Sequence, residues 1–338
     1  MPVKYSTAWK QALIPGTILA LVLLIGLPLL NGLGFLSDYY LNLFGKYLAL
    51  AILARRILES PATISPPGPG ERDTVVEGVR WRSREAPGSG PPVVYVHGLL
   101  QTSASWKRAL GPASGGRPAV AVDLPGFGLS DRPWPYDYTV GGQATALLRY
   151  LDARGFDRVV LVGNSLGGAV CLLVAAARPS RVAALVLVGS ASPISNIPWN
   201  FRFLRTQIVG ELEMELLIRP VVEVALRQRL FSRGERVTEE EVDEDWRSIR
   251  VPGTRRAALA AVRSSSRGYE GYLSRIRIPT LVLWGKDDRI LPPEEGLRLA
   301  TAIPGAHLVV LPDTGHVPQE ETPEEFSHAV SQFLAGLK

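Results

Sequence analysis

Short apolar runs alternate with helix-like segments from about residue 90 to the C-terminus. The clearest apolar runs are Val93–Val96, Ala119–Val122, Val159–Val162, Ala184–Val188, Thr280–Leu283 and His307–Leu311. Several are apolar without alternation, which is typical of strands buried on both faces. Segments with helical spacing lie between them: Gln143–Arg154, Leu166–Ala177, Glu294–Ala302 and Pro323–Leu337. This order predicts an α/β fold, with a mainly parallel sheet between two layers of helices.

The alternation is interrupted by a long insertion, residues 192–278, which shows no clear buried strand. Helical periodicity covers Glu211–Leu230, and Thr238 with Glu241 has the spacing of a capping box. We therefore expect a helical insertion that divides the sheet domain into residues 74–191 and 279–338.

The N-terminus has a different pattern. Residues 11–37 carry no charge, and within them residues 12–30 have the length and apolar character of a membrane span. A cleaved signal peptide is the alternative, but no small-x-small cleavage site follows Leu30, so a retained anchor is favoured. The sequence therefore predicts a membrane-anchored protein, of the bacterial inner-membrane type.

A second apolar stretch, residues 39–54, ends at Arg55 and Arg56. It fits either an interfacial helix or a short second span, and the two arrangements place the rest of the chain on opposite sides of the membrane. Residues 11–54 resemble the start of a urea or branched-chain amino-acid transporter permease, which slightly favours two spans. Residues 1–59 are thus expected to form the anchor, and residues 60–73, with four prolines and two glycines, a linker.

Charge and composition narrow the classes of function. The net charge is +5, and no basic stripe with interleaved aromatic residues is present, which argues against nucleic-acid binding. A single cysteine, Cys171, excludes a disulfide framework and a cysteine-based zinc site. Only four histidines exist, at positions 97, 307, 316 and 328, so histidine chemistry has few candidates.

The strongest chemical signal is Gly163-Asn-Ser165-Leu-Gly167, which follows an apolar run and precedes an apolar helix. G-x-S-x-G in this context is a nucleophile elbow, in which a sharp turn exposes the serine hydroxyl. The N–H of Leu166 and the dipole of the following helix then face a developing oxyanion. Ser165 is therefore the expected nucleophile.

With His97-Gly98 after one strand and Asp123-Leu-Pro-Gly-Phe-Gly after another, the chain resembles the α/β-hydrolase superfamily from about residue 73 onward. The resemblance implies an α/β-hydrolase fold in which the insertion is a cap over the pocket. It implies that the N–H of Leu99 is the second oxyanion donor, and that His97 and Asp123 are structural.

The acid and the base are expected on two later loops. Trp284-Gly-Lys-Asp-Asp288 matches the family pattern that places the acid four residues after the tryptophan, and adjacent Asp287 is the alternative. His316 follows the last strand, whereas His307 and His328 lie within a strand and a helix. The order Ser165, Asp288, His316 is that of the hydrolase triad.

This triad predicts hydrolysis of a carboxylic ester through an acyl-serine intermediate, as in esterases and monoacylglycerol lipases of the superfamily. The expected substrate is a small-molecule or lipid ester, and no metal or organic cofactor is implied. Carbon–carbon bond hydrolases and haloperoxidase-like esterases are alternatives of the same fold. The carbon–carbon hydrolases usually show a glycine pair after His-Gly and a tryptophan after the catalytic histidine, where this chain has Leu99, Leu100 and Val317. A non-catalytic membrane-anchored binding protein is a more distant alternative.

Overall fold

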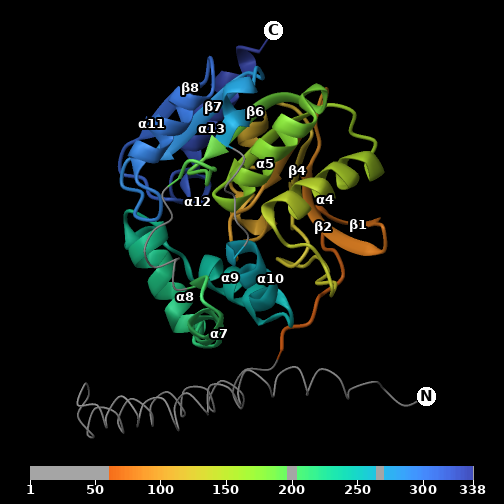
Figure 1. Cartoon of the computed structure of the whole chain (residues 1–338), viewed down its shortest axis with the longest axis vertical. Helices are drawn as coiled ribbons and strands as arrows, with labels where there is room; N and C mark the ends of the chain where they lie inside the picture. Colours follow the sequence, from red (N-terminus) through yellow and green to blue (C-terminus); the bar gives the residue numbers. More distant parts are fainter. Residues whose placement is uncertain (1–60, 196–203, 264–269, 338) are drawn as a thin grey trace, which may run out of the picture. The chain divides into compact units, whose positions relative to one another are not determined.

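A computed structural model describes residues 61–195, 204–263 and 270–337 (Figure 1). The chain divides into two compact units: Met1–Ser60 with Phe203–Ile218, and Pro61–Arg202 with Arg219–Lys338. The described part of the first unit contains α7 (Gln207–Glu215), and the sheet belongs to the second. The expected membrane segments, residues 12–30 and 39–54, lie outside the described residues. Among the helices that are described, none has the length and apolarity needed to cross a bilayer.

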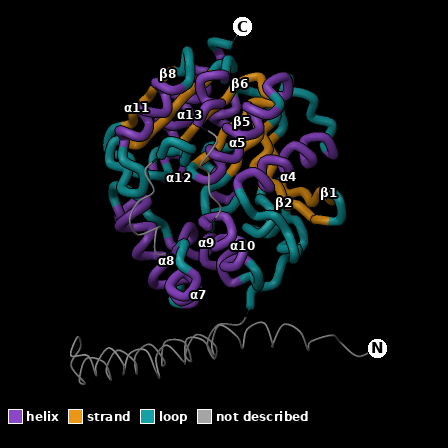
Figure 2. Tube along the Cα trace, in the orientation of Figure 1, coloured by secondary structure: helices purple, strands orange, loops and turns teal. Residues whose placement is uncertain are grey.

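An eight-stranded sheet forms the centre of the second unit, in the spatial order β1-β2-β4-β3-β5-β6-β7-β8 (Figure 2). The pairs β1–β2 and β2–β4 are antiparallel, and all other pairs are parallel. The strands are β1 (Glu71–Val76), β2 (Val79–Ala86), β3 (Val93–Val96), β4 (Ala119–Val122), β5 (Val159–Asn164), β6 (Val182–Val188), β7 (Thr280–Gly285) and β8 (His307–Leu311). The six predicted strands correspond to β3–β8, so the mainly parallel sheet is confirmed.

The hairpin of β1 and β2 was not predicted, and it changes the domain boundary. The linker was expected to extend to residue 73, but β1 begins at Glu71. The hairpin was not predicted because its two strands, at the β1 edge of the sheet, carry many charged residues. Arg82 is only 1% exposed, and its guanidinium pairs with Glu71 at 2.8 Å and with Asp73 at 2.6 Å. Charged residues can be buried in a strand when they are paired. They interrupt the run of apolar residues from which the strand would be predicted.

Helices cover both faces of the sheet. On one face, α13 (Pro323–Ala335) packs Phe326, Val330 and Leu334 against alternate strand residues that include Tyr95 and Val162. On the other face, α4 (Val140–Ala153) and α5 (Leu166–Ala177) pack together, and α5 contacts β5 and β6 (Figure 1). The remaining core helices are α11 (Pro293–Ala302) and the short α12 (Pro318–Glu321).

Between β6 and β7 the described residues form helices and turns without a strand. In the second unit these are α8 (Arg219–Ala225), a π-helix (Leu226–Leu230), α9 (Glu239–Arg250) and α10 (Thr254–Arg263). The capping box at the start of α9 has both of its hydrogen bonds, from Glu241 N to Thr238 Oγ1 and from Thr238 N to Glu241 Oε2. The periodic stretch Glu211–Leu230 is not one helix, because α7 ends at Glu215 and α8 begins at Arg219.

Candidate active site

Ser165 lies in the turn between β5 and α5, with φ 51° and ψ −114°. A positive φ at a non-glycine residue costs about 1–3 kcal/mol and persists only where the surroundings enforce it. Here Ser165 N donates to Val188 O, and Ala191 N donates to Ser165 O, each at 3.0 Å. Leu166 is the first residue of α5, so its N–H has no acceptor within the helix. The turn therefore places this N–H directly after the serine, at the position expected of an oxyanion donor.

The close approach of backbones makes glycine necessary on both sides of Ser165. A Cβ atom on Gly163 would lie 2.5 Å from the carbonyl oxygen of Gly167. A Cβ atom on Gly167 would lie 2.2 Å from the carbonyl oxygen of Val96 in β3. Any side chain at either position would push α5 away from the sheet and open the turn.

Asp288 and His316 meet on the loops after β7 and β8. His316 Nδ1 lies 2.7 Å from Asp288 Oδ2, and both side chains are buried. Asp288 Oδ1 accepts the backbone N–H groups of Ile290 and Leu291 at 2.8 and 2.9 Å. The carboxylate is therefore fixed by three donors, whereas Asp287 is exposed. This geometry favours Asp288 over Asp287 as the partner of the histidine.

The residue before the serine connects the elbow to the histidine loop. Asn164 Nδ2 donates to the carbonyl oxygens of Val188 and His316, each at 3.0 Å. Asn164 is completely buried, so these bonds form away from solvent. The structure thus brings Ser165, Asp288 and His316 to the carboxyl ends of β5, β7 and β8.

The insertion also holds the histidine loop. His316 N donates to Leu230 O, at the end of the π-helix, at 2.6 Å. The Glu321 carboxylate is buried, and it accepts the N–H of Gly315 at 2.6 Å together with the N–H and hydroxyl groups of Ser232. Part of the insertion is therefore built into the support of His316.

The peptide between Gly98 and Leu99 is oriented by its carbonyl group. Gly98 O accepts from His97 Nδ1 at 2.7 Å and from Gln101 N at 3.3 Å. The C=O and N–H of a trans peptide point in opposite directions, so the Leu99 N–H points away from these two donors. A Cβ atom on Gly98 would lie 3.3 Å from Ser165 Cβ, which places this peptide beside the elbow.

The other histidines occupy different environments. His97 Nε2 accepts the N–H of Leu124 at 3.1 Å, so its proton is on Nδ1. Burial lowers the pKa of His97 and keeps the ring neutral, which suits a structural role. His307 and His328 are exposed, on β8 and α13.

Asp123 is also held by the backbone around it. Its carboxylate accepts the N–H groups of Ser103 at 2.5 Å and Leu129 at 2.7 Å. Both oxygens are thereby occupied in organising the loop after β4.

No group of His, Cys, Asp or Glu suited to a metal ion occurs in the described ranges, 61–195, 204–263 and 270–337.

Four side chains that support this site carried no signal in the sequence. They are Asn164, Gln101, Glu320 and Glu321. Each acts through contacts with residues distant along the chain; Gln101 and Glu320, for example, are 219 positions apart. Asn164 lies at a variable position of the G-x-S-x-G motif, and Gln101 lies three residues after Gly98, but neither motif specifies the residue found there.

An eight-stranded sheet with a strained serine elbow and a histidine–aspartate pair at its carboxyl edge defines the class of α/β-hydrolases. The family model for the alpha/beta hydrolase fold matches residues 91–323. The chain therefore belongs to the alpha/beta hydrolase family, as the resemblance predicted.

Named relatives extend this comparison. The 2-hydroxy-6-oxo-2,4-heptadienoate hydrolase of Pseudomonas putida is 32% identical over 73% of this chain and 90% of its own. Among solved structures, a serine hydrolase of carbazole degradation, CarC, is 26% identical with a TM-score of 0.67, covering 78% of this chain and 98% of its own. A membrane phospholipase A described as a bacterial virulence factor is 26% identical with a TM-score of 0.64, covering 92% and 98%. The similarity to the heptadienoate hydrolase favours the carbon–carbon alternative over the predicted ester hydrolysis.

Proposed function

We propose that this chain is a serine hydrolase in which Ser165 attacks a carbonyl carbon of the substrate. The observation that carries the proposal is the strained Ser165 turn beside a buried Asp288–His316 pair at 2.7 Å. Asp288 accepts the Nδ1 proton, which leaves Nε2 of neutral His316 free to take the serine proton. The N–H groups of Leu99 and Leu166 stabilise the negative charge that develops on the carbonyl oxygen.

The reaction then proceeds in two halves. The tetrahedral intermediate collapses to an acyl-serine, and His316 gives its proton to the leaving group. A water molecule next transfers a proton to His316 while its oxygen attacks the acyl carbon. The second tetrahedral intermediate then collapses, His316 returns the proton to Ser165 Oγ, and a carboxylic acid is released. The same two reaction steps apply whether the leaving group is an alcohol or a carbon that departs as a stabilised carbanion.

We place a 2-hydroxy-6-oxo-dienoate-type compound first among substrates, because named relatives with this activity match across most of their length. Such a compound must first move the proton of its 2-hydroxyl group to C5, which gives the 2,6-dioxo tautomer. The C5–C6 bond then breaks, and C5 departs as a dienolate conjugated with the 2-oxo acid. A lipid or other carboxylic ester is the second candidate. It is favoured by the similarity to the membrane phospholipase A, and by Leu99, Leu100 and Val317 where carbon–carbon hydrolases usually have glycines and tryptophan.

Purified enzyme assayed with 2-hydroxy-6-oxo-2,4-heptadienoate, p-nitrophenyl butyrate and a monoacylglycerol will separate these candidates. We expect kcat/KM for the dienoate to exceed that for either ester by at least about tenfold, because specificity is set by differences in transition-state binding. The reverse ranking would make the enzyme an esterase. Absence of both hydrolysis and fluorophosphonate labelling would overturn the serine-hydrolase proposal.

We further propose that residues 12–30 anchor the enzyme to a membrane, on the basis of their uncharged run. The full chain should remain with membranes after a carbonate wash, because apolar burial is insensitive to salt and charge. A chain that begins at Pro61 should fractionate as soluble and keep its activity on dissolved substrates. Release of the full chain by carbonate would contradict an anchor, and an N-terminus beyond residue 30 would identify a cleaved signal.

A further inference from the structure

One buried amide bridges the loop that carries the Leu99 N–H and the helix that follows His316. Gln101 is 3% exposed. Its Oε1 accepts the N–H of Gly98 at 3.2 Å, and its Nε2 donates to Glu320 Oε1 at 2.9 Å. Both ends of the amide are therefore used, and the two bonds fix which end is oxygen and which is nitrogen.

The Gln101 side chain completes a network that holds Gly98 through the peptide on each side of it. The Gly98 carbonyl is fixed by His97 Nδ1 and by the Gln101 backbone N–H, as described above. The Gly98 N–H is fixed by the Gln101 side chain. The chain then passes through Leu100, with φ 63°, a conformation that needs support at a non-glycine residue. The Gly98 N–H belongs to the preceding His97–Gly98 peptide, so without the Gln101 amide Gly98 would be held only through its carbonyl oxygen.

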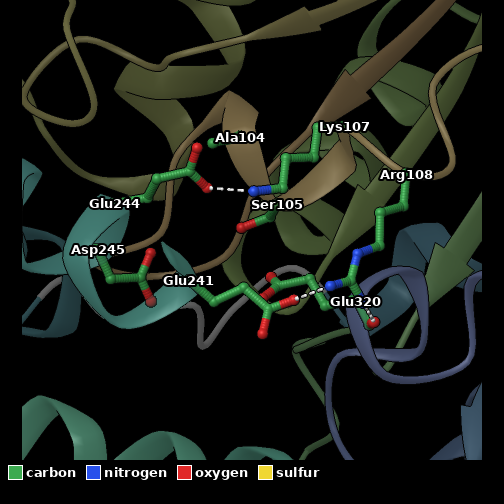
Figure 3. A pocket seen from close by; sticks show the side chains of 8 residues that line it. All are labelled: Ala104, Ser105, Lys107, Arg108, Glu241, Glu244, Asp245 and Glu320. Atoms are coloured by element: carbon green, nitrogen blue, oxygen red, sulfur yellow. Dashed lines mark hydrogen bonds and ion pairs between the residues drawn. The ribbon is translucent and has the colours of Figure 1, made fainter. Parts of the chain in front are cut away.

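Glu320, the far partner, is anchored where α9 meets the core. Its carbonyl oxygen accepts from Arg108 Nη1 at 3.2 Å, and its Oε1 accepts from Gln101 Nε2. The groups around it are shown in Figure 3: Ser105, Lys107 and Arg108 on the core side and Glu241, Glu244 and Asp245 on α9. Burial raises the pKa of Glu320 well above its usual value, and the neighbouring carboxylates of Asp245 and Glu241 raise it further.

We propose that Gln101 is a positioning residue for catalysis, which holds the Leu99 N–H in the oxyanion site by tying Gly98 to Glu320. This inference rests on the proposed serine-hydrolase function. Gln101 touches no reacting atom; it acts through the orientation of Gly98, the residue that precedes the Leu99 N–H. Its loss should therefore weaken stabilisation of the transition state more than it weakens binding of the substrate.

The first test replaces the amide by an isosteric apolar group. Gln101→Leu is expected to lower kcat on p-nitrophenyl butyrate by ten- to a hundredfold, with KM within about threefold, because a displaced oxyanion donor affects the transition state selectively. Gln332→Leu, at an exposed glutamine on α13, is the matched control. The control must match the wild type in ester hydrolysis and fluorophosphonate labelling. Absence of both from the wild type as well would mean that the proposed function itself has failed. Unchanged kcat in Gln101→Leu alongside an active control would overturn the inference.

The second test exchanges the two polar groups. In Gln101→Glu, two carboxyl groups face each other and can share a hydrogen bond only while Glu320 keeps its proton. Its kcat relative to wild type should therefore fall as pH rises, because ionised Glu320 repels the new carboxylate. Gln101→Glu with Glu320→Gln restores both bonds, since the glutamate accepts from Gly98 N–H and from the amide of the new glutamine.

The double variant should therefore recover most of kcat and lose the extra pH dependence. A merely structural requirement for glutamine would not produce rescue by exchange. A double variant as impaired as Gln101→Glu throughout the pH range would overturn the positioning role, even if Gln101→Leu failed to fold.

Discussion

Replacing Ser165 with alanine is expected to lower hydrolysis by about 10⁴-fold or more and to abolish fluorophosphonate labelling. Loss of a nucleophile that acts together with its base and acid has an effect of this size. The variant should keep its Tm near the wild-type value, because alanine retains the Cβ atom and the elbow backbone bonds to Val188 and Ala191 remain. Activity and stability should thus separate at this position.

The matched control is Ser331→Ala, on α13, whose hydroxyl donates only to the carbonyl of His328 at the helix surface. It should label and hydrolyse like the wild type. If Ser165→Ala were still labelled, the nucleophile would have to be another serine.

The neighbouring aspartates should differ by orders of magnitude. Asp288→Asn is expected to lower kcat by roughly 10⁴-fold, because an amide facing His316 Nδ1 favours the wrong tautomer of the ring. Asp287→Asn should stay within about threefold, since Asp287 is exposed and its backbone N–H bond to Thr314 survives the change. Steady-state kinetics of the two variants on one substrate measure the contrast directly. A larger loss in Asp287→Asn would assign the acid to the adjacent position.

The features that could be predicted from the sequence are those determined by residues close together along the chain. The elbow needs a strand, two glycines and a helix within a dozen residues, so Ser165 and the bounds of α5 were predictable. Asp288 and His316 were reached through the order of motifs, although their 2.7 Å contact joins residues 28 positions apart. Strands β3–β8 were visible because they are buried on both faces.

The features that escaped prediction depend on pairing at a distance. Arg82 made β2 look polar, and only its partners Glu71 and Asp73 explain its burial. The Gln101–Glu320 hydrogen bond could not be predicted from the sequence, because a single glutamine or glutamate is common on protein surfaces and does not indicate a buried pair. The helical spacing of apolar residues also continues from α7 into α8, so it predicted one helix where there are two. Such spacing does not show where a helix ends.

The hydrogen bond from His316 N to Leu230 O has a consequence for how such enzymes diversify. A lid that only covered a pocket would be exchangeable among relatives as an independent module. In this chain Leu230, at the end of the π-helix, accepts from His316 N, and Ser232 donates to Glu321, so a transplanted cap would arrive without the acceptor for the histidine loop. Chimeras that change substrate range are therefore best joined with residues 226–237 left native, because recombination inside that segment would alter the chemistry together with the specificity.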